Sequence, residues 1–175
     1  MKHMVRGFVC LAFAAGMSFA ALADFFVDGA STTPESPYNS PEKAAKTIAD
    51  ALAAAKDAIA AGDASAVIHI ANGTYDETGF VLDGPIDIEG ESRDGVIIND
   101  NVAGSRAFTI SPADAVVRNL TIQGYGLGQN KTGGNGGHIN MSAGLVEYCV
   151  IKDGRSSHST SKGNGGNVYM SGGKL

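Results

Sequence analysis

A nine-residue stretch near the end of this chain occurs twice, and the two copies are 29 positions apart. Residues 134–142 read GNGGHINMS, and residues 163–171 read GNGGNVYMS. The same offset aligns residues 117–122, VRNLTI, with residues 146–151, VEYCVI. Two separate segments that keep one offset indicate a repeating architecture, in which equivalent strands of successive repeats stack on one another.

The second pair of segments predicts how the strands stack. We expect Val117 and Ile122 to point inward on either side of a two-residue bend at 118–119. Val146 and Ile151 would then lie on them, at the ~4.8 Å spacing of neighbouring strands.

Short strands predominate before the repeat. Turn-forming pairs such as Asn72-Gly73 and Asp94-Gly95 separate them, and no second helix-length pattern interrupts them. This excludes a doubly wound α/β sheet, which needs helical crossovers. Strand count alone leaves a β-sandwich possible, but the fixed period favours a solenoid. The expected strands are residues 67–70, 80–82, 86–88, 96–98, 108–110 and 120–122.

One amphipathic helix is predicted over residues 40–62, after an extended segment at 24–39. Ser40 is an N-cap candidate, Pro41 fits the first helical position, and Gly62 can end the helix. The polar face carries charges of both signs, which argues against binding to a membrane surface. Apolar residues at three- and four-residue steps form one narrow stripe: Ala44, Ile48, Leu52, Ala55 and Ile59.

Residues 1–23 have the pattern of a secretory signal peptide. Lys2 and Arg6 precede an apolar run, and Ala21-Leu22-Ala23 is a small-x-small cleavage site before Asp24. The apolar run is shorter than the ~20 residues that a spanning helix needs, which disfavours a membrane anchor. We therefore expect a secreted or cell-surface protein.

The net charge argues against one class of partner, and the cysteine content argues against a disulfide. The net charge of −5 argues against a nucleic-acid partner. Cys149 is the one cysteine after residue 23, so no intramolecular disulfide is expected.

Two segments resemble a known family. Residues 67–100, which include the turn Asn-Gly-Thr-Tyr, look like the first turns of the right-handed parallel β-helix, or pectin-lyase-like, superfamily. Residues 116–124, VVRNLTIQG, resemble its commonest later rung. The resemblance covers roughly residue 25 to the end of the chain. It implies an all-β solenoid, a right-handed parallel β-helix over residues 66–175, with an N-terminal amphipathic capping helix at 40–62.

The end of the second repeat carries one further expectation. The first copy continues into strand-like residues, whereas the second stops at Lys174-Leu175 with no capping element. An uncovered end would expose unpaired strand edges. We expect the chain to be the N-terminal part of a longer solenoid, truncated at its C-terminus, or to have that end covered by a partner.

The resemblance leaves enzymatic activity open. It implies, for the enzymes of the superfamily, acidic residues on one outer sheet that bind calcium or serve as acid and nucleophile, with a nearby Arg or Lys. The sequence motifs of the esterases and hydrolases do not occur, so no catalytic residue is assigned. If the protein is an enzyme, the resemblance implies a polysaccharide lyase, a hydrolase or a carbohydrate esterase. No cofactor or metal is expected apart from calcium, and that only through the resemblance.

Three polar strand residues are interpreted as surface. Asp87 and Glu89 alternate on one expected strand, a pattern typical of a solvated face. His69, between two isoleucines, is expected to point outward.

The repeated glycines predict a structural corner. A phosphate loop would need a lysine and a following helix, and a calcium nonapeptide would need an aspartate where His138 and Asn167 stand. A flexible linker is disfavoured because strands follow at once. Glycines would supply positive φ, and Asn135 above Asn164 could form a hydrogen-bonded ladder.

The strands that follow the glycines predict a ligand-binding face. With Ile139 and Met141 inward, four polar residues would face outward. Polar insertions at 125–133 and 154–162 would stack into a wall beside them. Such a groove suits an extended glycan, which needs amide partners and an aromatic platform. The candidate ligand-binding residues are His138, Asn140, Asn167 and Tyr169.

Two functions follow from the sequence. The first is binding of an extended polysaccharide, with cleavage in a downstream part. The alternative is a non-catalytic cell-surface passenger or adhesin, because residues 165–169, GGNVY, are similar to Gly-Gly-x-Ile repeats of outer-membrane proteins. A downstream acidic cluster with Arg or Lys would favour the first, and a membrane-anchoring segment the second.

Overall fold

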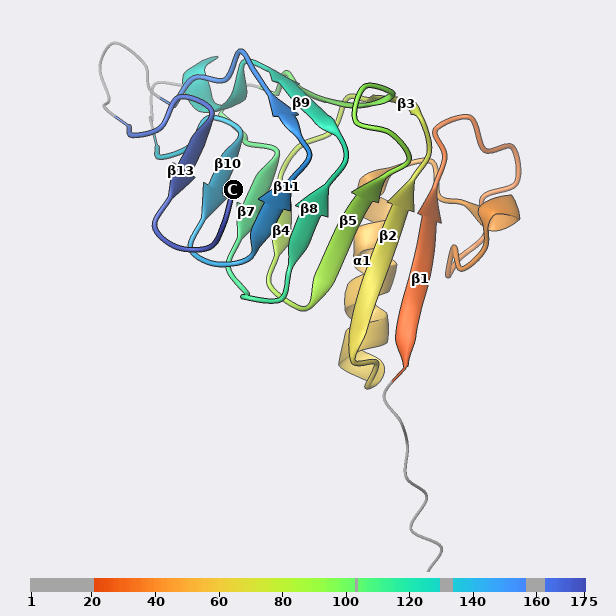
Figure 1. Cartoon of the computed structure of the whole chain (residues 1–175). Coiled ribbons are helices and arrows are strands. Elements are labelled where there is room, and N and C mark those ends of the chain that lie inside the picture. The colour runs from red at the N-terminus through yellow and green to blue at the C-terminus, as the bar shows by residue number, and fades with distance from the viewer. Residues whose placement is uncertain (1–20, 103, 130–133, 157–162) are drawn as a thin grey trace, which may run out of the picture.

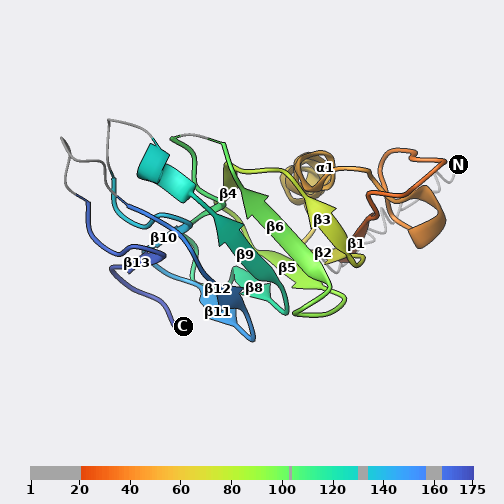
Figure 2. The ribbon, with the colours of Figure 1, turned by 90° about the horizontal axis from the view of Figure 1, so that it is seen from above.

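The computed structural model describes residues 21–102, 104–129, 134–156 and 163–175, and their strands form three parallel sheets (Figures 1 and 2). The first sheet has the order β1 (Leu22–Val27), β2 (Ser65–Ile70), β5 (Ile86–Gly90), β8 (Val116–Arg118) and β11 (Leu145–Glu147). The second contains β3 (Gly73–Tyr75), β6 (Val96–Asp100), β9 (Thr121–Gly124) and β12 (Val150–Ile151). The third contains β4 (Phe80–Leu82), β7 (Phe108–Ile110), β10 (Ile139–Met141) and β13 (Val168–Met170).

The predicted fold class, an all-β solenoid formed by a right-handed parallel β-helix with an N-terminal capping helix, is wrong. The described strands form three short, separate parallel sheets, none of which closes into a barrel, together with one α-helix. That helix, α1 (Ile48–Ala61), is not N-terminal, because β1 precedes it. It connects β1 to β2, which are adjacent and parallel, and such strands need a crossover connection.

Strand β1 was missed because it overlaps the end of the apolar run. It begins at Leu22, before the expected cleavage site at Ala23-Asp24, and pairs with β2 along its whole length. Most of the proposed signal peptide, residues 1–20, lies outside the described residues. No helix in the described ranges is long and apolar enough to cross a membrane.

The helix also begins later than residue 40. Ser40 precedes only a 3₁₀ turn, Pro41–Lys43, after which Ala45 forms a bridge with Val27 of β1. The N-cap is Thr47, whose hydroxyl accepts a hydrogen bond from the Asp50 N–H at 3.1 Å and donates to its carboxylate. The predicted end is confirmed, since Gly62 caps the helix with φ 119°.

A carboxylate from a distant segment completes this cap. The two oxygens of Glu77 accept hydrogen bonds from the Ile48 and Ala49 N–H groups, at 2.9 and 3.0 Å. These N–H groups have no partner inside the helix, and a negative charge is favourable at its positive end. Glu77 therefore ties the start of α1 to the segment between β3 and β4.

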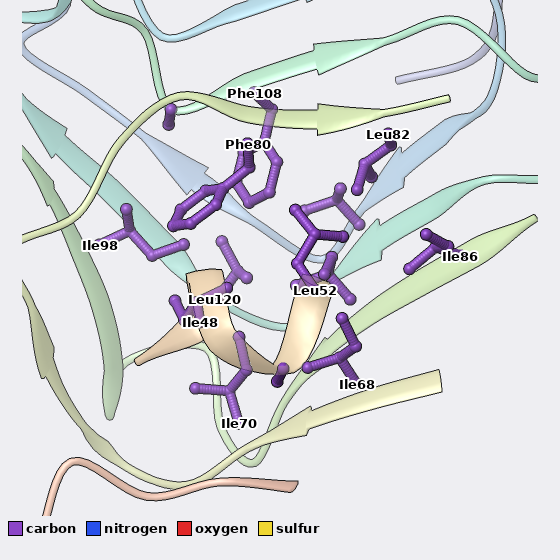
Figure 3. Close-up of a cluster of buried hydrophobic side chains, with 14 of the residues drawn as sticks. Ile48, Leu52, Ile68, Ile70, Phe80, Leu82, Ile86, Ile98, Phe108 and Leu120 are labelled. Atoms are coloured by element: carbon purple, nitrogen blue, oxygen red, sulfur yellow. The ribbon is translucent and has the colours of Figure 1, made fainter. Parts of the chain in front are cut away.

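The core lies between the sheets and against α1. Figure 3 shows Ile48 and Leu52 of α1 in one cluster with Ile68 and Ile70 of β2, and all four are buried. Phe80 of β4 and Phe108 of β7 are register partners whose ring centroids lie 5.3 Å apart. Like side chains thus stack on like from strand to strand.

The 29-residue offset is confirmed as strand register. Val117 pairs with Val146 and Ile122 with Ile151, as the repeat predicts. The bend between these strands places Asn119 in left-handed backbone, and its side chain donates to the Gly90 carbonyl at 2.7 Å. Tyr148 occupies the equivalent position in the next repeat.

The glycine corner is also confirmed in its backbone. Gly136 and Gly165 have φ of 71° and 69°, and a Cβ on Gly136 would lie 1.8 Å from the Ile139 carbonyl oxygen. The expected ladder of stacked asparagine amides takes another form. The Asn135 side-chain oxygen accepts from the Asn164 backbone N–H at 3.0 Å.

Replacing Glu77 with alanine is expected to lower the free energy of unfolding by about 1–2 kcal/mol, because two helix N–H groups lose a charged acceptor. Urea denaturation followed by circular dichroism measures this loss. Glu35→Ala, which removes only an exposed ion pair with Lys43, should stay within about 0.5 kcal/mol of the parent. Equal losses in the two variants would show that Glu77 does not cap α1.

Candidate functional site

The four predicted ligand-binding residues divide into two pairs. Asn140 and Tyr169 are register partners on β10 and β13, and both are half-buried on the outward side. His138 is fully buried, so its predicted outward orientation is wrong. It precedes β10 in the glycine corner, where the alternation of a strand does not apply. Asn167, its counterpart one repeat later, is half-buried, and its amide is hydrogen-bonded to the backbone of Ile151 and Gly154.

His138 and Asn167 hold the segment that follows β12. His138 Nε2 lies 2.9 Å from the Lys152 carbonyl oxygen. The Asn167 amide donates to the Ile151 carbonyl at 3.2 Å and accepts from the Gly154 N–H at 2.6 Å. A Cβ on Gly154 would lie 2.5 Å from the His138 ring, so the segment can approach this closely only with glycine. These two residues position this turn through their hydrogen bonds.

Behind the turn lies a buried ion pair. His138 Nδ1 is 2.9 Å from Asp100 Oδ2, and neither side chain is exposed to solvent. Because a carbonyl oxygen only accepts, the bond to Lys152 requires a proton on His138 Nε2. One further proton then lies between Nδ1 and the carboxylate, and the pair is electrically neutral wherever that proton sits.

Burial raises the pKa of Asp100, and the hydrogen bond from His138 opposes that increase. The second oxygen, Oδ1, is buried without a hydrogen-bond partner among the described residues. Arg106 is the nearby cation, and burial lowers the pKa of its guanidinium.

A cavity of about 690 Å³ opens beside this turn. Its walls come from the ends of β6 and β9 and from the residues after β12, which the repeat brings side by side. We call it the amide cleft, and its polar lining consists of Asn99, Asn101, Gln123, Tyr125, Asp153 and Arg155.

Amide side chains are oriented along one wall of the amide cleft. The Asn99 amide donates to Asp76 at 2.9 Å, and the Gln123 amide donates to the Asn99 oxygen at 2.8 Å. Asn99 and Gln123 are register partners on β6 and β9, so the strands set the spacing of the ladder. Because each N–H₂ group points toward Asp76, the Gln123 oxygen is left at the opposite end as an acceptor.

The rim adds an aromatic ring and two charges. Tyr125 follows β9 and is 47% exposed. Asp153 and Arg155 are exposed on either side of Gly154, and Asp153 has φ 66°, a left-handed conformation that is uncommon outside glycine. The turn held by His138 and Asn167 therefore carries both charges to the cleft.

Sequence reasoning missed the amide cleft although the signal was present. The 29-residue offset aligns residues 123–125 with residues 152–154, so the ends of consecutive strands had to meet. The predicted wall of insertions at 125–133 and 154–162 lies partly outside the described residues.

The outward face of the first sheet is charged. Arg118 donates to Asp87 at 3.1 Å and lies 4.0 and 3.9 Å from Glu89 and Glu147. Asp87 and Glu89 are half-buried, and burial raises the pKa of Asp87 although Arg118 opposes the increase. His69 points outward as predicted. Within the described ranges, no group of three His, Cys, Asp or Glu side chains is arranged to hold a metal ion.

The buried pair generates a prediction on stability. His138→Ala removes the partner of a buried carboxylate and should cost about 3–5 kcal/mol. Asp100→Asn should cost less, because its amide can donate to His138 Nδ1 without a buried charge. Urea denaturation provides both values.

The same pair predicts a pH dependence with a definite sign. A raised folded-state pKa stabilises the protein at low pH, and this contribution is lost as pH rises through the raised value. The parent should therefore lose stability relative to Asp100→Asn as pH increases above 3.8, the ordinary pKa of aspartate. Denaturation curves between pH 4 and 8 test this, and a relative gain by the parent would contradict it.

No protein-family model matches this chain, and no curated protein or solved structure is significantly similar to it. The resemblance drawn from residues 67–100 and 116–124 accordingly stays a prediction.

Proposed function

We propose that the amide cleft binds a segment of an extended polysaccharide. The observation that carries this proposal is the oriented ladder from Asp76 through Asn99 to Gln123, which runs along a cavity with a half-exposed tyrosine at its rim. Sugar hydroxyls both donate and accept hydrogen bonds, and amide side chains can also do both without carrying a charge. An aromatic ring offers an apolar face to the C–H groups of a sugar ring.

The direction of the ladder supports an extended ligand. Asp76 directly follows β3, and Asn99 and Gln123 lie on β6 and β9, the next strands of the second sheet, so polar groups recur at about the spacing of neighbouring strands. Arg155 supplies a cation on the rim, which suits a glycan that carries carboxylates. Secretion, predicted from residues 1–23, would bring the cleft into contact with extracellular glycans.

Binding can be tested with an array of linear neutral and uronate oligosaccharides, followed by calorimetry on the best ligand. Tyr125→Ala is expected to weaken binding roughly tenfold, or by about 1.4 kcal/mol. Tyr148→Ala is the matched control, because Tyr148 is more exposed, at 75%, but does not line the cleft. Absence of binding, or equal weakening by both substitutions, would refute the proposal.

Arg155→Gln separates recognition of charge from recognition of hydroxyl groups. If the glycan carries carboxylates, this variant should lose affinity for uronate oligosaccharides and keep its affinity for neutral ones. Gln123→Ala should weaken both kinds of ligand, because it removes the acceptor at the end of the ladder.

A further inference from the structure

A second cavity, of about 620 Å³, shares no lining residue with the amide cleft and lies where β1, β2 and β5 of the first sheet end. Its floor is formed by the last residues of these strands, and Pro41 and Ala44 close one side. In Figure 1 these strand ends lie next to the loop that follows β1. We call this cavity the strand-end pocket. Its volume is within the range of small-molecule sites.

Strand register places an aromatic surface beside a carboxylate in this pocket. Phe26, His69 and Glu89 are successive register partners on β1, β2 and β5, so their side chains form one row on the outward face. The rings of Phe26 and His69 stack with centroids 5.1 Å apart and an angle of 26° between their planes. His69 Nε2 lies 2.9 Å from Asp24 Oδ1, which fixes the ring.

The carboxylate of Glu89 is only loosely paired. Its oxygens lie 3.9 Å from His69 Nδ1 and 4.0 Å from Arg118 Nε, and both distances exceed hydrogen-bond length. Arg118 is next to Glu89 in the row but donates its hydrogen bond to Asp87 instead. Glu89 thus retains capacity to bind a cation from the pocket.

Two further carboxylates line the same cavity. Asp28 accepts the Ala30 N–H through one oxygen, and Glu91 accepts the Asn72 N–H through one oxygen. No lysine or arginine is among the described residues that line it. Burial raises the pKa of the Tyr75 phenol, and the negative charges of Asp28, Glu77 and Glu91 raise it further.

We propose that the strand-end pocket binds a small organic ammonium ion, with the carbon skeleton against Phe26 and the charge beside Glu89. Val27 and Ile70 also line the pocket, but their side chains are buried in the core, so the apolar surface open to a carbon skeleton comes mainly from Phe26, Pro41 and Ala71. An aromatic ring offers an apolar face to a carbon skeleton, and a partly desolvated carboxylate forms strong charge-assisted hydrogen bonds with an ammonium group. An anion would be repelled by all three carboxylates.

Cyclohexylammonium and cyclohexanol are suitable probes, because they share a ring and differ in charge. Titration of the ¹⁵N-labelled protein should shift amide signals around Phe26, His69 and Glu89 with the ammonium, and cyclohexanol should bind at least about tenfold more weakly. Glu89→Gln should weaken ammonium binding about tenfold, and Phe26→Ala should weaken binding of both probes.

Glu147→Gln is the matched control, since it removes the same charge from the same row but beyond Arg118. It should change the affinity for the ammonium less than twofold. Equal weakening by Glu89→Gln and Glu147→Gln would overturn the proposal, as would equal binding of cyclohexanol or no shifts with the ammonium. Calcium chloride that perturbs the same signals at lower concentration than the ammonium would assign the pocket to a metal ion instead.

Discussion

Parallel stacking of identical or similar apolar side chains is the constraint on which the rest of this structure depends. Ile68, Ile88, Val117 and Val146 form one such row through the first sheet, each the register partner of the next. A slip of one residue would turn every inward side chain outward. The register of the inward rows therefore also sets the register of the outward side chains. It places Asn99 beside Gln123 in the second sheet, and it places Phe26, His69 and Glu89 side by side in the first.

Much of the local fold could be predicted where one segment repeated another. The pairing of Val117 with Val146, the bend at Asn119 and the glycine corner all followed from the 29-residue offset. The start of α1 could not, because Glu77 caps it from a separate segment and Ala45 is held by β1. The pairing of the early strands was harder to predict, because they do not keep the 29-residue offset. Ala66, for example, pairs with Ile86, which is only 20 positions later.

The candidate site was less predictable than the strands. Alternation assigns a side chain to a face only inside a strand, and His138 lies in a corner. Its partner Asp100 is 38 positions earlier in the chain, and nothing in the pattern of either residue indicates the other. Asn140 and Tyr169, which are inside strands, do lie on the outward side as expected.

The parallel pairing has a consequence for how the chain assembles. Strand partners in the described residues are separated by between 20 positions, as for Ala66 and Ile86, and 43 positions, as for Leu22 and Ser65, so no pair can begin as a hairpin. Loop-closure entropy increases only slowly with length, and no pairing gains much by being local. Apolar burial then guides the order, and α1 packs Ile48 and Leu52 into the core beside β1 and β2. We expect folding to start around this helix and to spread toward β13, one strand at a time.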